Sequence, residues 1–444
     1  MFGCHYIFKM LFLLILAIYS LTEVNPLENG LARTPPMGWM SWGYYMCGIK
    51  CENDTDKCLN EKLILSVVDS MYTEGYQEAG YEYIIIDDCW SEKERDLNGR
   101  LVADKKRFPS GMKFLADYIH AKGLKFGMYT NVASVTCMHF PGSRSHFDID
   151  ARTFAEWGVD YLKVDGCFVA EDYLNEAYIN LGNHLNHTGR PMVFSCSWPY
   201  YIEFIHNHKP NLKEISRHCN LWRNYHDVTM KWNAIVATIM YYKTNHRELA
   251  PHHGPGHWND PDMLIFGTRA LSRSQSRVQL VVYAMWSAPL LLSCDMTRIT
   301  RYEKELLLNM DLVAIAQDPM GIMATPHELS NRVTLWVKPH HPLKGDLYPT
   351  HSFAFVNLDI YGEQVTFTPE NYGLNSTDAY TIYVSYTFFL IRLFLFQEIW
   401  YCIHNFKPSP LRGRQREPGA TRHESLHVSL AYLTFIGPKS PGGV

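Results

Sequence analysis

The sequence has little net charge and no apolar run that could comfortably cross a membrane. Its 444 residues carry a formal net charge of −4, so no excess of one sign would draw the chain toward nucleic acid or acidic lipid. The apolar run Met10–Tyr19 is too short for a span. A later run, Phe388–Phe396, contains Arg392 and is followed by Glu398. We therefore expect neither a nucleic-acid partner nor a stable membrane span.

The composition predicts a globular enzyme that passes through the secretory pathway. With 47% hydrophobic and 14% aromatic residues, the chain can bury a large core, and its length suits two domains. Lys9, followed by the short apolar run, fits a secretory signal peptide over residues 1–22, with a retained anchor as the alternative. The Asn-x-Ser/Thr triplets predict glycosylation at Asn53, Asn186 and Asn375. The expected destination is lysosomal or secreted.

Cysteines are numerous for a chain of this kind, and the predicted oxidising compartment favours disulfides among them. Eight of the 11 cysteines fall in the first half of the mature chain: Cys47, Cys51, Cys58, Cys89, Cys137, Cys167, Cys196 and Cys219. The residues alone leave their pairing open. Zinc is the alternative, but Cys51 and Cys58 are too far apart for a usual ligand pair and no matching Cys or His pair follows. We predict no metal site.

Strand-like and helix-like stretches alternate from Pro36 to about Cys294. The eight expected strands are Met37–Trp42, Tyr83–Asp88, Lys125–Thr130, Tyr161–Asp165, Met192–Ser197, Leu221–Tyr225, Trp258–Leu264 and Leu290–Cys294. The expected helices include Glu61–Gly75, Met112–Gly123, Asp150–Gly158, Glu171–Asn186 and Thr229–Asn245. Eight such units in this length predict a closed (β/α)₈ TIM barrel rather than an open sheet. Pro255 and Pro261 interrupt the seventh strand.

The pattern changes after Gln317, where short runs alternate with period two. Such alternation, with turn residues between the runs, predicts an antiparallel β domain beside the barrel. We assign residues 27–318 to the catalytic barrel and residues 319–385 to the β domain. Residues 386–444 are atypical, and much of this segment is rich in Pro, Arg and Gly, which predicts a disordered tail and an incomplete or altered β domain.

Two carboxylates near predicted strand ends suggest glycosidic bond hydrolysis, which needs one carboxyl group as nucleophile or base and another to protonate the leaving oxygen. Asp165 follows Lys163 on the fourth strand, and Asp227 follows Arg223 just past the sixth. A nearby cation keeps a carboxylate ionised, and strand ends of a barrel converge on one substrate. Each Asp alone could equally be a helix cap or turn acid. The presence of both acids, each preceded by a cationic residue, argues for an active site.

The adjacent acids Asp87 and Asp88 end the second predicted strand. Such a pair could bind a divalent metal, but hard cations usually need further convergent oxygen ligands, so we favour recognition of sugar hydroxyls. Flat apolar side chains that could pack against the C–H face of a pyranose lie nearby in the sequence, although each is more often part of a core. They are Trp39, Trp42, Trp90 and Tyr129.

Long, ordered motifs carry a family resemblance. They are Pro35–Trp39, Ile86–Trp90, Lys163–Cys167, Phe194–Pro199, Trp222–Tyr225 and Trp258–Met263. Between about Leu27 and about Thr381 the chain resembles the lysosomal α-galactosidase and α-N-acetylgalactosaminidase family of retaining glycosidases. The resemblance implies a nucleophile at Asp165, an acid/base at Asp227, no metal or organic cofactor, and α-galactoside or α-N-acetylgalactosaminide substrates. It also implies a homodimer.

The resemblance further implies which residues hold the sugar and how the cysteines pair. Sugar hydroxyls would be held by Asp87, Asp88, Lys163, Arg223 and Asp262, and the pocket would be lined by Trp42 and Tyr129. Disulfides would join Cys47 to Cys89, Cys51 to Cys58, Cys137 to Cys167, and Cys196 to Cys219.

The segment Ser197–Tyr201 corresponds to the part of the family that faces the substituent at carbon 2 of the sugar. At the positions of Ser197 and Tyr200, α-galactosidases carry Glu and Leu, whereas α-N-acetylgalactosaminidases carry Ser and Ala. Ser197 therefore indicates the N-acetyl activity, while the bulky Tyr200 fits neither pattern. Together with Tyr201 they are expected to contact substrate. We expect an exo-glycosidase that removes terminal α-linked N-acetylgalactosamine, galactose or both from glycolipids, glycoproteins or oligosaccharides.

Two other classes of function are open to the same residues. A catalytically silent relative would keep the pocket as a sugar-binding site, and a metal-dependent barrel hydrolase would use the acids as ligands. The presence of both candidate catalytic carboxylates together with Lys163 and Arg223 favours the hydrolase without a metal.

Overall fold

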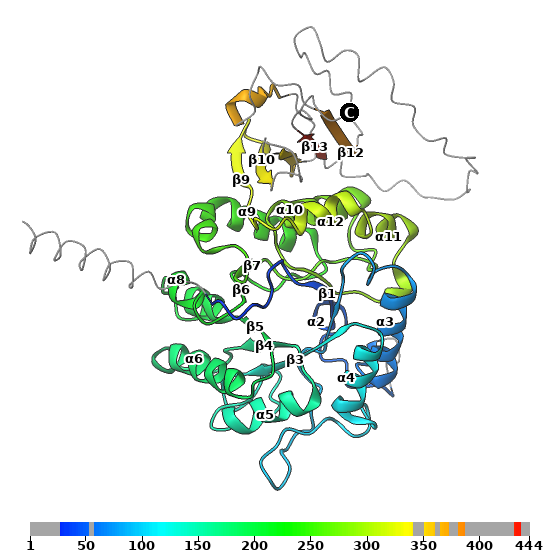
Figure 1. Ribbon diagram of the computed structural model, residues 1–444, viewed down its shortest axis with the longest axis vertical. Helices are drawn as coiled ribbons and strands as arrows, with labels where there is room; N and C mark the ends of the chain where they lie inside the picture. Colours follow the sequence, from blue (N-terminus) through cyan, green and yellow to red (C-terminus); the bar gives the residue numbers. More distant parts are fainter. Residues whose placement is uncertain are drawn as a thin grey trace, which may run out of the picture.

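Two β-sheets of different kinds make up the fold (Figure 1). The computed structural model describes residues 27–52, 57–340, 350–359, 365–372, 381–386 and 430–436. The predicted signal peptide at residues 1–22 and the glycosylation triplets at Asn53 and Asn375 lie outside the described residues.

The first sheet is a parallel barrel whose strands run in the order β7-β6-β5-β4-β3-β2-β1-β8. The strands are β1 (Met37–Met40), β2 (Tyr83–Ile85), β3 (Lys125–Asn131), β4 (Tyr161–Asp165), β5 (Val193–Cys196), β6 (Leu221–Arg223), β7 (Trp258–Asp260) and β8 (Leu290–Leu292). Leu264, just beyond β7, forms a parallel bridge with Leu292 and closes the cylinder. The predicted barrel is confirmed, and β7 ends at Asp260 because Pro261 cannot donate to the ladder.

Strand side chains divide between two apolar cores because successive side chains point to opposite faces of a sheet. Ile84 packs in the large core between the strands and the surrounding helices, whereas its neighbour Ile85 packs in the smaller core inside the barrel. Tyr83, Tyr161 and Trp258 share that interior. This double burial explains why the strands read as continuous apolar runs in the sequence.

Helices surround the barrel (Figure 1). They are α2 (Trp42–Tyr45), α3 (Glu61–Thr73), α4 (Gly111–Ala121), α5 (Phe147–Trp157), α6 (Glu171–His187), α7 (Trp198–Tyr200), α8 (Leu212–Ile215), α9 (Trp232–Leu249), α10 (Arg273–Met285), α11 (Arg301–Leu307) and α12 (Met310–Ala316). A π-helix, Tyr201–Ile205, follows α7. The five predicted helices are present. Asn186 is exposed near the end of α6, which leaves its predicted glycosylation sterically open. Among the described residues, no helix combines the length and apolarity of a membrane span.

The second sheet is antiparallel, in the order β12-β13-β11-β10-β9. Its strands are β9 (Thr325–Glu328), β10 (Val333–His340), β11 (Thr350–Asn357), β12 (Thr381–Tyr386) and β13 (Leu430–Ile436). The predicted antiparallel β structure after the barrel is thus confirmed. However, β13 lies in the segment predicted to be disordered, and for these seven residues that prediction was wrong. Their run of β-prone residues was hidden by the polar, Pro-rich composition around it.

The second sheet is anchored to the barrel helices by side chains of β10. Trp336 packs edge-on against Trp286 with ring centroids 5.3 Å apart. The Lys338 ammonium group is buried, and it donates to the carbonyls of Ala284 and Ile315 at 3.1 and 2.5 Å. Burial lowers the pKa of Lys338 to about 7, with the Asp318 carboxylate acting against the shift. A buried amino group with fixed acceptors specifies one docking position for the sheet.

Gly38 in β1 provides a test of strand packing. A Cβ atom there would lie 2.2 Å from the carbonyl oxygen of Tyr83 in the paired strand β2. We predict that Gly38→Ala lowers the free energy of unfolding by about 1–3 kcal/mol because the backbone cannot move aside without breaking the ladder. Chemical denaturation measures this change. Gly254→Ala is the matched control, since its Cβ would meet only ordinary contacts at 3.4 Å or more. Equal stability of the two variants would contradict the prediction.

Candidate active site

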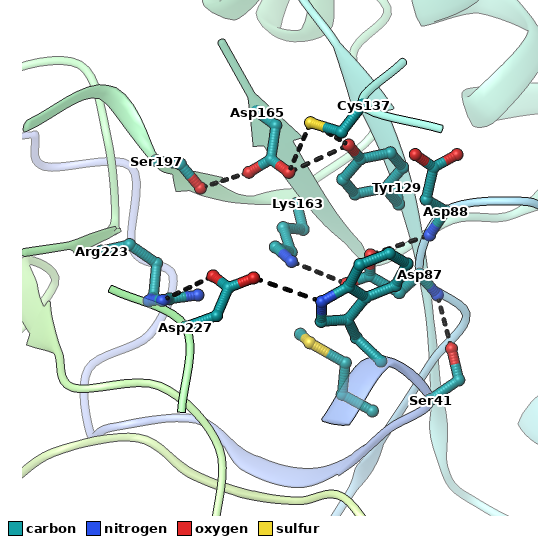
Figure 2. Close-up of polar contacts among 12 residues, drawn as sticks. Ser41, Asp87, Asp88, Tyr129, Cys137, Lys163, Asp165, Ser197, Arg223 and Asp227 are labelled. Carbon is teal, nitrogen blue, oxygen red and sulfur yellow. Dashed lines mark hydrogen bonds and ion pairs between the residues drawn. The ribbon is translucent and has the colours of Figure 1, made fainter. Parts of the chain in front are cut away.

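A cavity of about 200 Å³ opens at the carboxyl ends of the barrel strands (Figure 2). Its lining residues are Trp42, Asp87, Tyr129, Cys137, Asp165, Cys167, Ser197, Tyr200, Tyr201, Ile205, Arg223 and Asp227. The cavity is smaller than the roughly 300–1,000 Å³ typical of sites for drug-sized ligands, so it suits one small polar ring. A larger hollow of about 570 Å³ lies beside α9, but it contains neither candidate catalytic carboxylate.

Asp165 ends β4, and two hydroxyl groups fix its carboxylate (Figure 2). The Tyr129 hydroxyl donates to Oδ2 at 2.9 Å, and the Ser197 hydroxyl donates to Oδ1 at 2.5 Å. The family resemblance implied that Ser197 faces the sugar substituent. In the structure, the Ser197 hydroxyl is hydrogen-bonded to the Asp165 carboxylate. With both oxygens held, Asp165 is oriented toward the cavity as a nucleophile needs to be.

Asp227 lies just past β6, where two donors from different elements hold it. Arg223 Nη2 donates to Oδ1 at 3.0 Å, and the indole N–H of Trp42 donates to Oδ2 at 3.3 Å. The side chain is 58% exposed. Desolvation raises the pKa of Asp227, but the charges of Arg223 and Lys163 outweigh it and hold the pKa below its usual value. This group therefore takes up a proton only in acidic solution.

Lys163 and Asp87 form a buried ion pair, of which Asp87 lines the cavity and Lys163 lies behind it. Lys163 Nζ lies 2.7 Å from Asp87 Oδ2, and the backbone N–H of Asp87 donates to the Ser41 hydroxyl at 2.9 Å. Burial acts to lower the pKa of Lys163, but the carboxylates of Asp87 and Asp165 outweigh this effect and raise it. Lys163 therefore stays cationic and supplies positive charge beside the candidate nucleophile.

Arg223 bridges two acids. Its Nη1 lies 3.0 Å from Asp262 Oδ1, while Nη2 contacts Asp227. Asp262 also accepts the backbone N–H of Val228 at 2.7 Å, which fixes the loop that carries Asp227. Burial raises the pKa of Asp262 to about 7 against the opposing effect of Arg223. The Arg223 guanidinium thus ties the position of the exposed Asp227 to that of the buried Asp262.

Asp88 lies behind the cavity and tethers the neighbouring loop. It accepts the backbone N–H groups of Met138 and Cys89 at 3.0 and 2.6 Å. Burial raises the pKa of Asp88 to about 6 despite these hydrogen bonds. The loop that contains Cys137 is therefore held to the end of β2 through this carboxyl group.

Four disulfides join the pairs that the family resemblance implied: Cys47 to Cys89, Cys51 to Cys58, Cys137 to Cys167, and Cys196 to Cys219. The bridge between Cys137 and Cys167 forms part of the cavity wall, with the Tyr201 hydroxyl 3.0 Å from the Cys167 sulfur. The family resemblance implied this bridge without placing it in the wall, because a pairing does not say which side of the bond faces a ligand.

The structure brings most predicted site residues to the cavity and places others behind it. Those that line it are Trp42, Asp87, Tyr129, Asp165, Ser197, Tyr200, Tyr201, Arg223 and Asp227. Asp88, Lys163 and Asp262 are buried and do not line it. Trp39 and Trp90 are core residues, as the alternative reading allowed. Ile205 was missed, because the π-helix that turns it toward the cavity leaves no clear sequence signal.

A TIM barrel whose strand ends hold two carboxylates among buried cations and aromatic rings has the architecture of a glycoside hydrolase. Comparison with known proteins identifies the family. Residues 34–318 match the Melibiase_2 model, described as alpha galactosidase A, and the chain belongs to that family. It is therefore a glycoside hydrolase.

Relatives with both activities are similar to the chain. Human alpha-galactosidase A is 43% identical over 73% of this chain and 76% of its own length. The alpha-N-acetylgalactosaminidase of Gallus gallus is 46% identical over 67% of this chain and 73% of its own length. Among solved structures, alpha-galactosidase I from Mortierella vinacea is 30% identical with a TM-score of 0.66, covering 80% of this chain and 85% of that one.

Asp88 generates a prediction about stability and pH. Its pKa rises from 3.8 to about 6 on folding, so the native state binds this proton more tightly than the unfolded state. The stabilisation is complete below about pH 4 and is lost as the pH rises through 6, which lowers the free energy of unfolding by up to about 3 kcal/mol. Denaturation at a series of pH values measures the slope.

Asp88→Asn should flatten this slope between about pH 4 and 6, whatever its effect on absolute stability. Asp117→Asn, which removes an exposed carboxylate on α4, controls for the loss of one charge. If Asp88→Asn and the wild-type chain have the same slope, the buried carboxyl group does not contribute in this way.

Proposed function

We propose that the chain removes terminal α-linked N-acetylgalactosamine or galactose from glycoconjugates by double displacement. The observation that carries this proposal is the pairing of two unlike carboxylates at one small cavity. Asp165 is held by hydroxyl donors, and Asp227 is exposed beside Arg223. The relatives that support it include both alpha-galactosidases and alpha-N-acetylgalactosaminidases.

In the first step, an Asp165 oxygen attacks the anomeric carbon while Asp227 gives its proton to the leaving oxygen. The glycosidic C–O bond breaks, and a glycosyl ester forms on Asp165. In the second step, Asp227 takes a proton from water, which attacks the same carbon and releases the sugar and the Asp165 carboxylate. Arg223 stabilises the Asp227 carboxylate between the two steps, and Lys163 stabilises the Asp165 carboxylate before attack and after its release. The two displacements together retain the configuration at the anomeric carbon.

Acidic conditions support this chemistry. Arg223 and Lys163 hold the pKa of Asp227 low, so the free enzyme carries the required proton mainly at acidic pH. The raised pKa values of Asp88 and Asp262 likewise favour stability in acid. These features support an acidic compartment of the secretory pathway, and four disulfides support passage through an oxidising one.

The small side chain of Ser197 supports a preference for the N-acetylated sugar, and the adjoining wall is formed by Tyr200. Its ring stacks on Phe204 at 5.6 Å and meets His226 edge-on at 5.4 Å. These contacts hold the ring at the cavity edge. Ser197 is small and its hydroxyl is engaged by Asp165, which leaves more space at this wall than a larger side chain would. Galactose, which lacks the acetamido group, fits the same cavity as the alternative substrate.

The domain boundaries and assembly are part of the same proposal. Residues 27–318 would carry the catalytic barrel and residues 319–385 the β domain, with the signal peptide removed after about residue 22. The homodimer implied by the family resemblance is tested by sedimentation of the purified chain.

The catalytic assignment is tested with nitrophenyl α-N-acetylgalactosaminide and nitrophenyl α-galactoside at about pH 4.5. We expect Asp165→Asn to lower kcat at least about 1,000-fold and Asp227→Asn about 100-fold or more. Asp227→Asn should lose less on nitrophenyl substrates than on alkyl glycosides, because a good leaving group needs less protonation. Asp311→Asn, at an exposed acid in α12, is the control. A wild-type chain inactive on both sugars would favour the silent sugar-binding alternative.

Tyr200 is tested through the ratio of the two activities. We predict that Tyr200→Ala raises kcat/KM for the N-acetylated sugar relative to galactose by about three- to ten-fold, because removal of the ring enlarges the space beside Ser197. Tyr200→Phe is the matched control, because it keeps the ring at the cavity wall and removes only the hydroxyl group. An unchanged or lower ratio in Tyr200→Ala would show that the ring does not limit the acetamido group.

A further inference from the structure

An exposed aromatic pair lies beside the cavity wall. The rings of His139 and Phe168 stack with centroids 5.1 Å apart and planes inclined by 18°. Phe168 is 63% exposed, and His139 is also exposed. Phe168 directly follows Cys167, and His139 lies two residues after Cys137. Because the disulfide between these cysteines lines the cavity, it anchors both rings next to the catalytic pocket.

The backbone at both rings is strained. His139 has φ of 60° and Phe168 has φ of 64°, in the left-handed region that bulky residues rarely adopt. Such strain persists only where surrounding structure imposes it, and it concentrates at active sites and ligand clamps. Burial does not offset the strain at Phe168, because most of this side chain faces solvent. The pair therefore has the character of a binding surface rather than of core packing.

Two further exposed apolar side chains lie at the cavity or next in sequence to a residue that lines it. Ile205 lines the cavity and is 58% exposed. Met138 is 40% exposed, and its backbone N–H is fixed by Asp88. The interior of the cavity, in contrast, carries carboxylates and Arg223. The site thus combines a charged interior with exposed apolar side chains contributed by three separate segments.

This contrast matches the two halves of a glycoside. The small polar cavity encloses a single sugar, so the group attached to its anomeric carbon must project past the rim. We propose that the His139–Phe168 pair, together with Ile205, forms a subsite for a leaving group that has a flat apolar face. Two sources share this chemistry, an aromatic ring and the C–H face of a second pyranose. The inference rests on the proposed glycosidase function and adds the part of the substrate beyond the scissile bond.

Phe168→Gly tests the proposal without threatening the fold, because glycine adopts a φ of 64° without strain. The substrates are the methyl, nitrophenyl and glucosyl α-glycosides of the sugar that the wild-type enzyme prefers. We expect Phe168→Gly to lower kcat/KM about three- to ten-fold for the nitrophenyl or the glucosyl substrate, and less than two-fold for the methyl glycoside. Phe168→Tyr, which keeps the ring, should retain wild-type values.

Phe114→Ala is the matched control, because Phe114 is an exposed phenylalanine on α4 with 44% of its surface accessible. A loss confined to the nitrophenyl glycoside identifies an aromatic leaving group, and a loss confined to the disaccharide identifies a sugar face. Equal losses on all three substrates, or no loss on any, would overturn the subsite. A wild-type enzyme that cleaves none of the three would instead overturn the proposed function.

Discussion

The active site depends on two buried cations that offset the negative charges of several neighbouring carboxylates. Asp87, Asp262 and the candidate nucleophile Asp165 converge at the strand ends, and so many carboxylates together would repel one another in a protein interior. Lys163 and Arg223 offset this repulsion. Because each cation contacts or faces more than one acid, the position of every carboxylate is tied to that of its neighbours.

Much of the fold was predictable because the barrel strands are buried on both faces. Double burial produces apolar runs such as that ending at Asp87, and these are visible without structural information. The break in the seventh strand was equally predictable from Pro261. β13 was not, because its seven residues lie within a polar stretch and are stabilised by pairing with β11 and β12. Partners so distant in sequence leave no local signal.

The candidate site, too, was predictable from the sequence only in part. Residue type and strand position predicted the acids and their cations, since the carboxyl ends of parallel strands meet at one edge. The precise partner of each group depended on tertiary geometry. Ser197 contacts Asp165, and Ile205 reaches the cavity through a π-helix. Neither contact follows from spacing in the sequence, because each depends on how a loop or an irregular helix turns above the barrel.

The Cys137–Cys167 bridge gives the cavity a covalent wall, which links the maturation of the protein to its chemistry. Strand pairing and apolar burial need no oxidant, but this part of the wall is closed only when the two thiols are joined. Without that bond, the two loops beside Asp165 would be joined only by weaker contacts, and the stacked rings beyond them would lose their common anchor. The oxidation of one cysteine pair therefore bears on the shape of the substrate site as well as on stability.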